Sequence, residues 1–113
     1  MKKVYYLSTC DTCKKILREL QLDSAFELQD IKTEPITEEQ LEHLRSMTDS
    51  YESLFSRRSR QYRSRGLHEV ELTEQDYKKL ILEEYTFLKR PVIVNQDVIS
   101  IGNAKKEWSK HLA

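Results

Sequence analysis

The sequence predicts an α/β domain whose mixed sheet is interrupted by a helical segment. Three observations lead to this prediction. A short β-branched and aromatic run near the start is followed by an amphipathic helix and a second strand, the middle of the chain has helical patterns only, and residues 92–101 have the pattern of a β-hairpin. At 113 residues the chain has the length of one domain.

The first half of the predicted sheet has the order strand, helix, strand. Residues 4–7 (Val-Tyr-Tyr-Leu) form the first predicted strand, and the helix that follows runs to about Leu22. One face of this helix carries apolar side chains at i, i+3, i+4 and i+7: Cys13, Ile16, Leu17 and Leu20. Phe26 and Leu28 alternate with polar neighbours and Ile31 follows, which predicts a second strand parallel to the first.

The middle of the chain predicts helices. Thr37 with Gln40 three residues later is a capping box, so a helix begins near Thr37. Residues 48–72 have weak periodicity and many arginines, which indicates short helical turns on the surface. Thr73 and Asp76 predict the start of another helix.

The last part of the chain completes the predicted sheet. Residues 92–101 form a hairpin with its turn at 95–97, and Asn103 is predicted to cap a final helix. That helix is predicted to bury Ala104, Trp108 and Leu112. A βαβ half and a ββα half in one mixed sheet form a thioredoxin-like fold. We therefore predict a single domain over residues 1–113, with a helical insertion at about residues 36–87.

The composition limits the classes of partner. The formal net charge is +0, so no global field holds the chain on nucleic acid or on an anionic membrane. Five arginines surround Tyr62 between residues 57 and 65, but a charge-rich stretch is usually a solvated face, so nucleic-acid binding is not the preferred interpretation. No segment has the pattern of a signal peptide or a membrane span, which predicts a cytoplasmic location.

Cys10 is predicted to lie where the first strand ends and the first helix begins. The unpaired backbone N–H groups and the positive end of the helix dipole meet at that point and stabilise a thiolate. Lys14 and Lys15 add positive charge in the next turn, while Asp11 acts in the opposite direction. We expect Cys10 to be the exposed nucleophile.

Cys13 lies one helical turn after Cys10, so the two sulfur atoms can share a face and form a disulfide. We expect Cys13 to be the sheltered resolving thiol. Two alternatives are small half-buried cysteines without a function and a structural zinc site. Zinc needs about four ligands, and no second pair at finger-like spacing is formed by the histidines His43, His68 and His111, so we predict no metal.

Several motifs resemble those of the ArsC/Spx family of thioredoxin-fold proteins, and the similarity extends over essentially the whole chain. The two outer motifs are Tyr-Leu-Ser-Thr-Cys-Asp-Thr-Cys-Lys-Lys at residues 6–15 and Leu-Lys-Arg-Pro-Val-Ile-Val at residues 88–94. Between them, residues 54–59 (Leu-Phe-Ser-Arg-Arg-Ser) resemble the family's leucine-rich, arginine-bearing segment. Residues 101–102 and Trp108 resemble its carboxy-terminal signature.

The resemblance implies roles for individual residues. It implies that Cys10 is the nucleophile, that Arg90 helps to bind an oxyanion or thiol substrate, and that Pro91 is a cis-proline facing the cysteine. Arg58 is the best match for the middle-segment arginine. A guanidinium suits these roles because its fixed fork can hold an oxyanion or a glutathione carboxylate with two hydrogen bonds. Two residues beside the cysteines complete the predicted substrate-binding set, Thr12 and Lys14.

Two functions follow from the resemblance. The first is a thiol-dependent oxidoreductase without a bound cofactor, which uses glutathione with glutaredoxin, or thioredoxin, as reductant. The second is an Spx-like redox-switched regulator that binds the RNA polymerase α subunit. The family's arsenate reductases typically carry an arginine after the hairpin, where residues 99–103 have none, and Spx-like proteins usually have a glycine where Ser50 stands. The first departure weighs against arsenate as substrate, and the second places the regulator after the enzyme.

Overall fold

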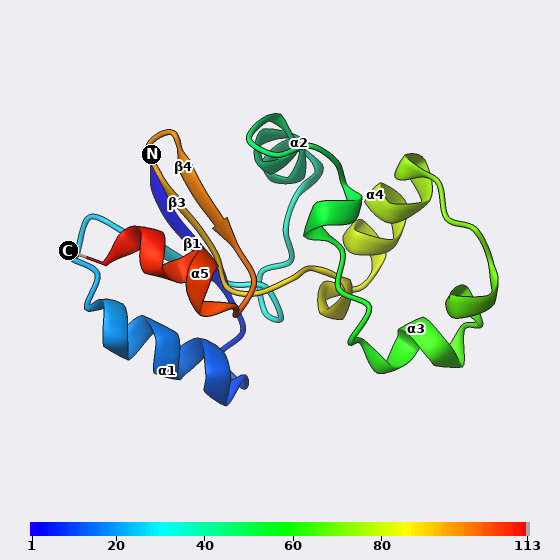
Figure 1. The fold of residues 1–113 in the computed structure, drawn as a ribbon, viewed down its shortest axis with the longest axis horizontal. Coiled ribbons are helices and arrows are strands. Elements are labelled where there is room, and N and C mark those ends of the chain that lie inside the picture. The colour runs from blue at the N-terminus through cyan, green and yellow to red at the C-terminus, as the bar shows by residue number, and fades with distance from the viewer. Residues whose placement is uncertain (113) are drawn as a thin grey trace. The chain divides into compact units, whose positions relative to one another are not determined.

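The computed structural model describes residues 1–112, which form two compact units (Figure 1). Unit 1 consists of Met1–Pro35 together with the chain from Arg90 onward, and unit 2 is Ile36–Lys89. Unit 2 occupies nearly the same residues as the predicted helical insertion. That the two units form a single domain stays a prediction. Within residues 1–112 no helix is both long and apolar enough to cross a membrane.

Unit 1 contains a mixed four-stranded sheet with the order β2-β1-β3-β4. The strands are β1 (Lys2–Tyr6), β2 (Glu27–Asp30), β3 (Val92–Asn95) and β4 (Val98–Ile101). β1 is parallel to β2 and antiparallel to β3, and β3 is antiparallel to β4. The predicted thioredoxin-like architecture of a βαβ half and a ββα half is confirmed.

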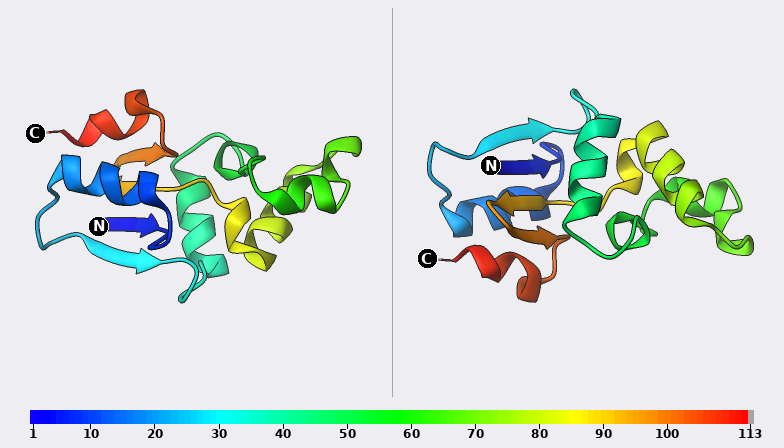
Figure 2. Two further views of the ribbon diagram at one scale, coloured as in Figure 1. Left: turned by 90° about the horizontal axis from the view of Figure 1, so that it is seen from below. Right: turned by 90° about the horizontal axis from the view of Figure 1, so that it is seen from above.

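The helices α1 (Asp11–Leu20) and α5 (Lys105–Trp108) pack on one face of this sheet. Figure 2 shows α1 in front of the strands in one view and behind them in the opposite view. The core between the layers is formed by Val4, Ile16, Leu20, Ile93 and Trp108. These side chains are at most 8% exposed, so their burial supplies the main hydrophobic stabilisation of unit 1.

In β2 the apolar pattern predicts a buried Leu28 and an exposed Gln29, and the structure shows the reverse. Leu28 is 54% exposed, whereas Gln29 is only 2% exposed. Leu28 pairs with Val4 and lies on the helix-covered face, but β2 is the edge strand, where less of that face is covered. Gln29 is buried on the opposite face, and its amide donates a hydrogen bond to the carbonyl of Glu34 (2.9 Å).

The final helix is shorter than predicted. It begins after Ala104, which is the N-cap instead of Asn103 and has no side-chain capping bond. The α-helix ends at Trp108 and continues as a 3₁₀ turn over Ser109–His111. Trp108 is buried as predicted, whereas Leu112 is exposed, because a 3₁₀ turn has about three residues and does not keep a spacing of four on one face. Ala104 is also exposed, since it precedes the helix as its N-cap.

Helix α1 ends at Gln21 in a left-handed conformation (φ 48°, ψ 51°), with the Gln21 N–H bonded to the carbonyl of Leu17 (3.1 Å). This conformation costs a residue with a Cβ about 1 kcal/mol, a penalty that glycine avoids. We therefore expect Gln21→Gly to raise the free energy of unfolding by about 0.5–1 kcal/mol in urea titrations. The exposed helix-interior change Glu19→Gly should instead lower it by about 1 kcal/mol. A loss of stability in Gln21→Gly would contradict the expectation.

Unit 2 contains the helices α2 (Glu38–Ser46), α3 (Arg60–Ser64) and α4 (Glu74–Glu83). Short 3₁₀ turns lie at Glu52–Leu54, Leu67–Glu69 and Tyr85–Phe87. The predicted capping box of Thr37 with Gln40 is present before α2, and the helix start predicted at Thr73 and Asp76 also forms a capping box, before α4. An antiparallel bridge pairs Phe55 with Leu88, near the end of the unit.

An aromatic cluster forms the centre of unit 2. The ring of Phe55 stacks on Phe87 with centroids 5.1 Å apart and contacts Tyr77 at 4.9 Å and Tyr62 at 6.1 Å. Phe55 and Phe87 are completely buried. Residues 48–72 do form short helical turns as predicted. The prediction that the whole stretch lies on the surface was wrong, because Phe55 within it is part of this buried core.

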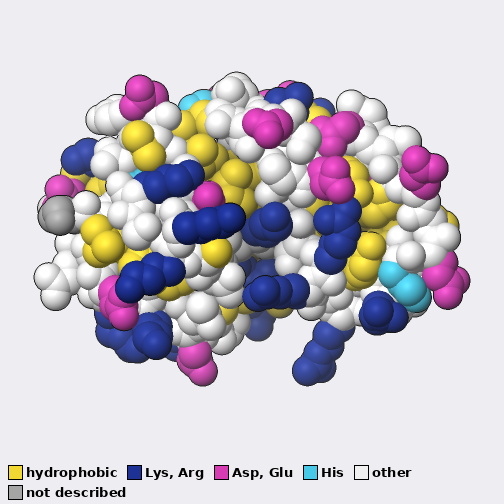
Figure 3. All heavy atoms as spheres, in the orientation of Figure 1, with side chains coloured by type: hydrophobic (Ala, Val, Ile, Leu, Met, Phe, Trp, Pro, Cys, Tyr) yellow, Lys and Arg dark blue, Asp and Glu magenta, His cyan; other side chains and the backbone are white. Residues whose placement is uncertain are grey.

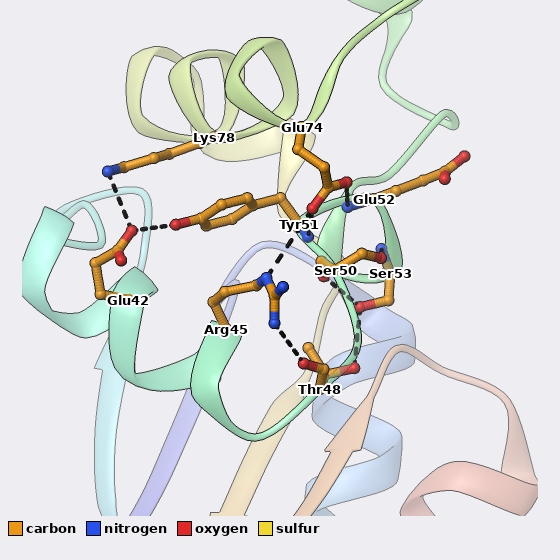
Figure 4. A network of polar contacts seen from close by, with 9 residues as sticks. All are labelled: Glu42, Arg45, Thr48, Ser50, Tyr51, Glu52, Ser53, Glu74 and Lys78. Atoms are coloured by element: carbon orange, nitrogen blue, oxygen red, sulfur yellow. Dashed lines mark hydrogen bonds and ion pairs between the residues drawn. The ribbon is translucent and has the colours of Figure 1, made fainter.

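A polar network joins the helices of unit 2 (Figure 4). The Glu74 carboxylate accepts hydrogen bonds from the backbone N–H groups of Tyr51 (2.7 Å) and Glu52 (3.2 Å). The Tyr51 hydroxyl donates to Glu42, which also pairs with Lys78 (3.1 Å). The network therefore ties α2, α4 and the 3₁₀ turn between them, and the Glu42 carboxylate raises the pKa of Tyr51.

Candidate active site

The loop after β1 places Cys10 at the start of α1. Cys10 is the N-cap residue and has an extended backbone (φ −96°, ψ 112°). Its N–H donates to the Leu7 carbonyl (3.0 Å), which closes the turn, and its carbonyl accepts the first helical hydrogen bond from Lys14 (3.2 Å). The Cys10 side chain is partly exposed. Its sulfur lies at the positive end of the helix, beside the first-turn N–H groups that have no partner within the helix.

The surroundings of Cys10 favour its thiolate. Partial burial alone would raise the pKa of Cys10, but four opposing effects outweigh it. The Cys13 backbone N–H and thiol donate hydrogen bonds to the sulfur, the positive charge of Arg90 is nearby, and the Thr12 N–H also donates. The pKa of Cys10 is therefore below its ordinary value, which is the condition for a reactive cysteine.

Cys13 has the opposite character. Its side chain is completely buried, and this burial, with the hydrogen bond and charge of Cys10, raises the pKa of Cys13 to about 12. The Leu7 N–H and Arg90 act in the other direction without overcoming burial. Both cysteines are free thiols. The pair is therefore asymmetric, because the surroundings favour the thiolate form of Cys10 and the protonated form of Cys13.

Arg90 and Pro91 lie at the start of β3, in the same unit as the cysteines. The Arg90–Pro91 peptide bond is cis, as the resemblance implies. Arg90 is close enough to lower the pKa of both thiols. The structure therefore brings together three of the predicted site residues, Cys10, Cys13 and Arg90.

Comparison with known proteins gives the family. The family model described as "ArsC family" matches residues 5–111. This chain belongs to the ArsC family. The global transcriptional regulator Spx of Enterococcus faecalis is 28% identical, over 99% of this chain and 86% of that protein. Spx of Streptococcus agalactiae is 29% identical, over 90% of this chain and 76% of that protein.

Solved structures show the same fold. A putative arsenate reductase from Yersinia pestis superposes with a TM-score of 0.79 at 15% identity, over 97% of this chain and 99% of that one. An ArsC-family-related protein from Bacteroides fragilis gives 0.79 at 22% identity, over 97% of both chains. At these identities the likeness concerns the fold alone. It confirms that this ArsC-family chain has the thioredoxin-like arrangement.

The remaining predicted residues of this ArsC-family site differ in their surroundings. Thr12 contributes its backbone N–H to Cys10, while its side chain is exposed. Lys14 is exposed and pairs with Asp11 (4.0 Å). The substrate-binding roles of Thr12 and Lys14 stay predictions.

Two neighbouring arginines of unit 2 have different partners. Arg57 bonds to the Glu52 carboxylate (2.7 Å) and donates to the Tyr77 hydroxyl (2.9 Å). Arg58 is exposed, and no ion pair holds its guanidinium within the described part of the chain. Arg58 is therefore the one of the two that can bind an anion. It belongs to unit 2, so its role at the cysteine pair stays a prediction.

The charged surface is mixed. Figure 3 shows Lys and Arg side chains together with Asp and Glu side chains on the face drawn. In the arginine-rich stretch, Arg65 also has an acidic neighbour, Glu83 (3.7 Å). Among residues 1–112, no three or more His, Cys, Asp or Glu side chains are grouped so that they could hold a metal ion.

Sequence reasoning missed two residues beside the cysteine loop, Ser8 and Asp30. The Ser8 hydroxyl donates to an Asp30 carboxylate oxygen at 2.5 Å, and this bond is the main cause of the lowered pKa of Asp30. Ser8 lies just beyond the end of β1, and Asp30 is the last residue of the parallel neighbour β2. The carboxyl ends of parallel strands meet at one edge of a sheet, so the predicted parallel pair places both residues at the same edge but does not fix their register.

Proposed function

We propose that this ArsC-family protein is a thiol-dependent oxidoreductase in which Cys10 attacks the substrate and Cys13 resolves the product. The observation that carries the proposal is the asymmetry of the pair, with the pKa of Cys10 lowered and the pKa of Cys13 raised to about 12. An attacking thiol has to be a thiolate, whereas a resolving thiol has to wait until the first bond has formed.

The reaction is a pair of thiol–disulfide exchanges. The Cys10 thiolate attacks one sulfur of a disulfide R–S–S–R′, forms a Cys10–S–S–R mixed disulfide and releases R′–S⁻, which takes up a proton. Cys13 then loses its proton and attacks the Cys10 sulfur. This step forms the Cys10–Cys13 disulfide and releases R–S⁻. The substrate gains two electrons and the cysteine pair loses two.

The second step follows from the change in charge at Cys10. In the mixed disulfide Cys10 is neutral, so its negative charge no longer raises the pKa of Cys13. The favourable effects of the Leu7 N–H and Arg90 on the Cys13 thiolate remain. The pKa of Cys13 therefore falls when the resolving thiol is needed.

The proposed substrate is the disulfide of a small thiol compound, and Arg90 with Arg58 would bind its negative groups. An oxyanion is the alternative ligand for the same guanidinium groups. The proposed reductant is glutathione with glutaredoxin, or thioredoxin, whose two electrons return Cys10 and Cys13 to free thiols. The proposed location is the cytoplasm, where such reductants keep thiols reduced. No bound cofactor takes part in this scheme.

The rate of alkylation of Cys10, measured as a function of pH, tests the proposal. In a Cys13→Ser background, where one thiol reports alone, we expect a midpoint below the ordinary cysteine value of about 8.5. Arg90→Gln should raise this midpoint by about 1 pH unit because it removes a positive charge that favours the thiolate. The matched control is Arg18→Gln, at the exposed far end of α1, which should leave it unchanged. A midpoint at or above 8.5 in the parent would overturn the proposal.

A second candidate is a redox-switched regulator, because relatives named global transcriptional regulator Spx match nearly the whole chain. In this candidate the Cys10–Cys13 disulfide changes the affinity for the RNA polymerase α subunit. Purified α subunit should then bind the oxidised and reduced chains with different affinities in a titration. Equal affinities, or no binding in either state, would exclude it.

A further inference from the structure

We propose that Asp30 is a positioning residue for Cys10, because its carboxylate anchors Ser8 and thereby fixes the loop that places Cys10 at the start of α1. The inference rests on the proposed function, in which Cys10 is the attacking group. It assigns a role to a residue that touches neither cysteine and lies about twenty positions away in the sequence.

The Asp30 carboxylate is bonded on both oxygens. One oxygen accepts the Ser8 hydroxyl at 2.5 Å. The other accepts the backbone N–H of Lys32 (3.2 Å) and, at longer range, that of Ser8 (3.5 Å). The Asp30 backbone carbonyl accepts the N–H of Glu34 (2.8 Å). The Asp30 carboxylate is therefore held by the turn that follows β2 as well as by its bonds to Ser8.

The anchored residue lies in the turn that leads from β1 to Cys10. Ser8 follows Leu7, whose carbonyl accepts the Cys10 N–H (3.0 Å) and whose N–H donates to the Cys13 sulfur. Only Thr9 separates Ser8 from Cys10. The bonds from the N–H groups of Thr12 and Cys13 depend on the direction in which the Cys10 side chain leaves this turn. A fixed Ser8 therefore keeps the Cys10 sulfur aligned with the N–H groups of Thr12 and Cys13 that donate to it.

The charge of Asp30 and its anchoring have opposite effects on Cys10. A carboxylate near the loop repels a thiolate, so removing only the charge should lower the pKa of Cys10. Removing the anchor should raise that pKa, because the N–H donors lose their alignment. An asparagine at this position keeps the anchor, since its oxygen can accept the two N–H groups and its NH₂ can donate to the Ser8 hydroxyl. Asp30→Asn and Asp30→Ala therefore remove the same charge but differ in the anchor.

The experiment measures the alkylation midpoint of Cys10 against pH in the full chain with Cys13→Ser. We expect Asp30→Ala to lie about 0.5–1 pH unit above Asp30→Asn, and Ser8→Ala to lie above the parent. Asp23→Ala is the matched control. Asp23 also accepts a backbone N–H from two residues later, that of Ala25 (2.9 Å), but it lies after the far end of α1. The Cys10 midpoint of the Asp23→Ala variant should therefore equal that of the parent.

Equal midpoints in Asp30→Asn and Asp30→Ala would overturn the inference, because only the charge would then matter. If Asp30→Ala does not fold, as judged by circular dichroism, the Ser8→Ala result decides, and a midpoint at or below the parent overturns the inference. An ordinary midpoint of about 8.5 in the parent itself would instead contradict the proposed function. The two failures are therefore distinguishable.

Discussion

Replacing Cys10 with serine is expected to lower the rate of disulfide reduction at least about 10³-fold, because a serine hydroxyl stays protonated at neutral pH and cannot replace the thiolate. The substitution is nearly isosteric and lies at a helix N-cap, where serine is a favoured residue, so the fold should be kept. Steady-state turnover with glutathione and glutaredoxin, or with thioredoxin, measures the effect.

Cys13→Ser is the companion variant and should fail at a different step. It should still react once, because Cys10 keeps its thiolate, but it should accumulate the mixed disulfide that Cys13 would resolve. Mass spectrometry of the intact chain detects this adduct. The proposed roles would be refuted by an active Cys10→Ser enzyme, or by a Cys13→Ser variant that turns over normally without glutathione to replace the resolving thiol.

Phe55→Ala is expected to lower the free energy of unfolding by about 3–5 kcal/mol. The ring is completely buried between Phe87 and Tyr77, at centroid distances of 5.1 and 4.9 Å, so its loss removes both apolar burial and two aromatic contacts. Equilibrium unfolding in urea, followed by circular dichroism, measures the change. This is a large part of the 5–15 kcal/mol that stabilises a typical domain.

An exposed apolar residue of the same unit provides the control for Phe55→Ala. Val70 is 57% exposed, so Val70→Ala should change the free energy of unfolding by less than about 0.5 kcal/mol. A cost below about 1 kcal/mol for Phe55→Ala would show that the aromatic cluster does not support the fold.

The sequence predicts well those features that depend on neighbours within one or two helical turns. The capping box at Thr37 and the helix start at Thr73 depend only on residues up to three positions later, and both form. The parallel pairing of β1 with β2 and the place of Cys10 at a helix start also follow from local patterns and from the short connections of a βαβ unit. Cys10 and Cys13 could therefore be placed, and given different roles, from the sequence alone.

The features that escaped prediction depend on residues distant in the chain or on which surface is left uncovered. Alternation in β2 cannot show that Leu28 lies on an edge strand and is exposed. The burial of Phe55, just before an arginine-rich stretch, depends on Tyr77 and Phe87, which lie more than twenty residues later. The bond between Ser8 and Asp30 likewise needs the register of two strands, which the order of elements alone does not fix.

The construction of unit 1 from two stretches of chain has a consequence during protein synthesis. The cysteines and β1 leave the ribosome before unit 2, whereas Arg90 and β3 follow it. Before residues 90–95 emerge, β1 can pair only with β2, and two strands alone are marginally stable in water. A nascent chain therefore lacks the Arg90 charge, which is one of the effects that favour the Cys10 thiolate. The interactions that favour this thiolate are complete only after the carboxy-terminal strands have joined the sheet.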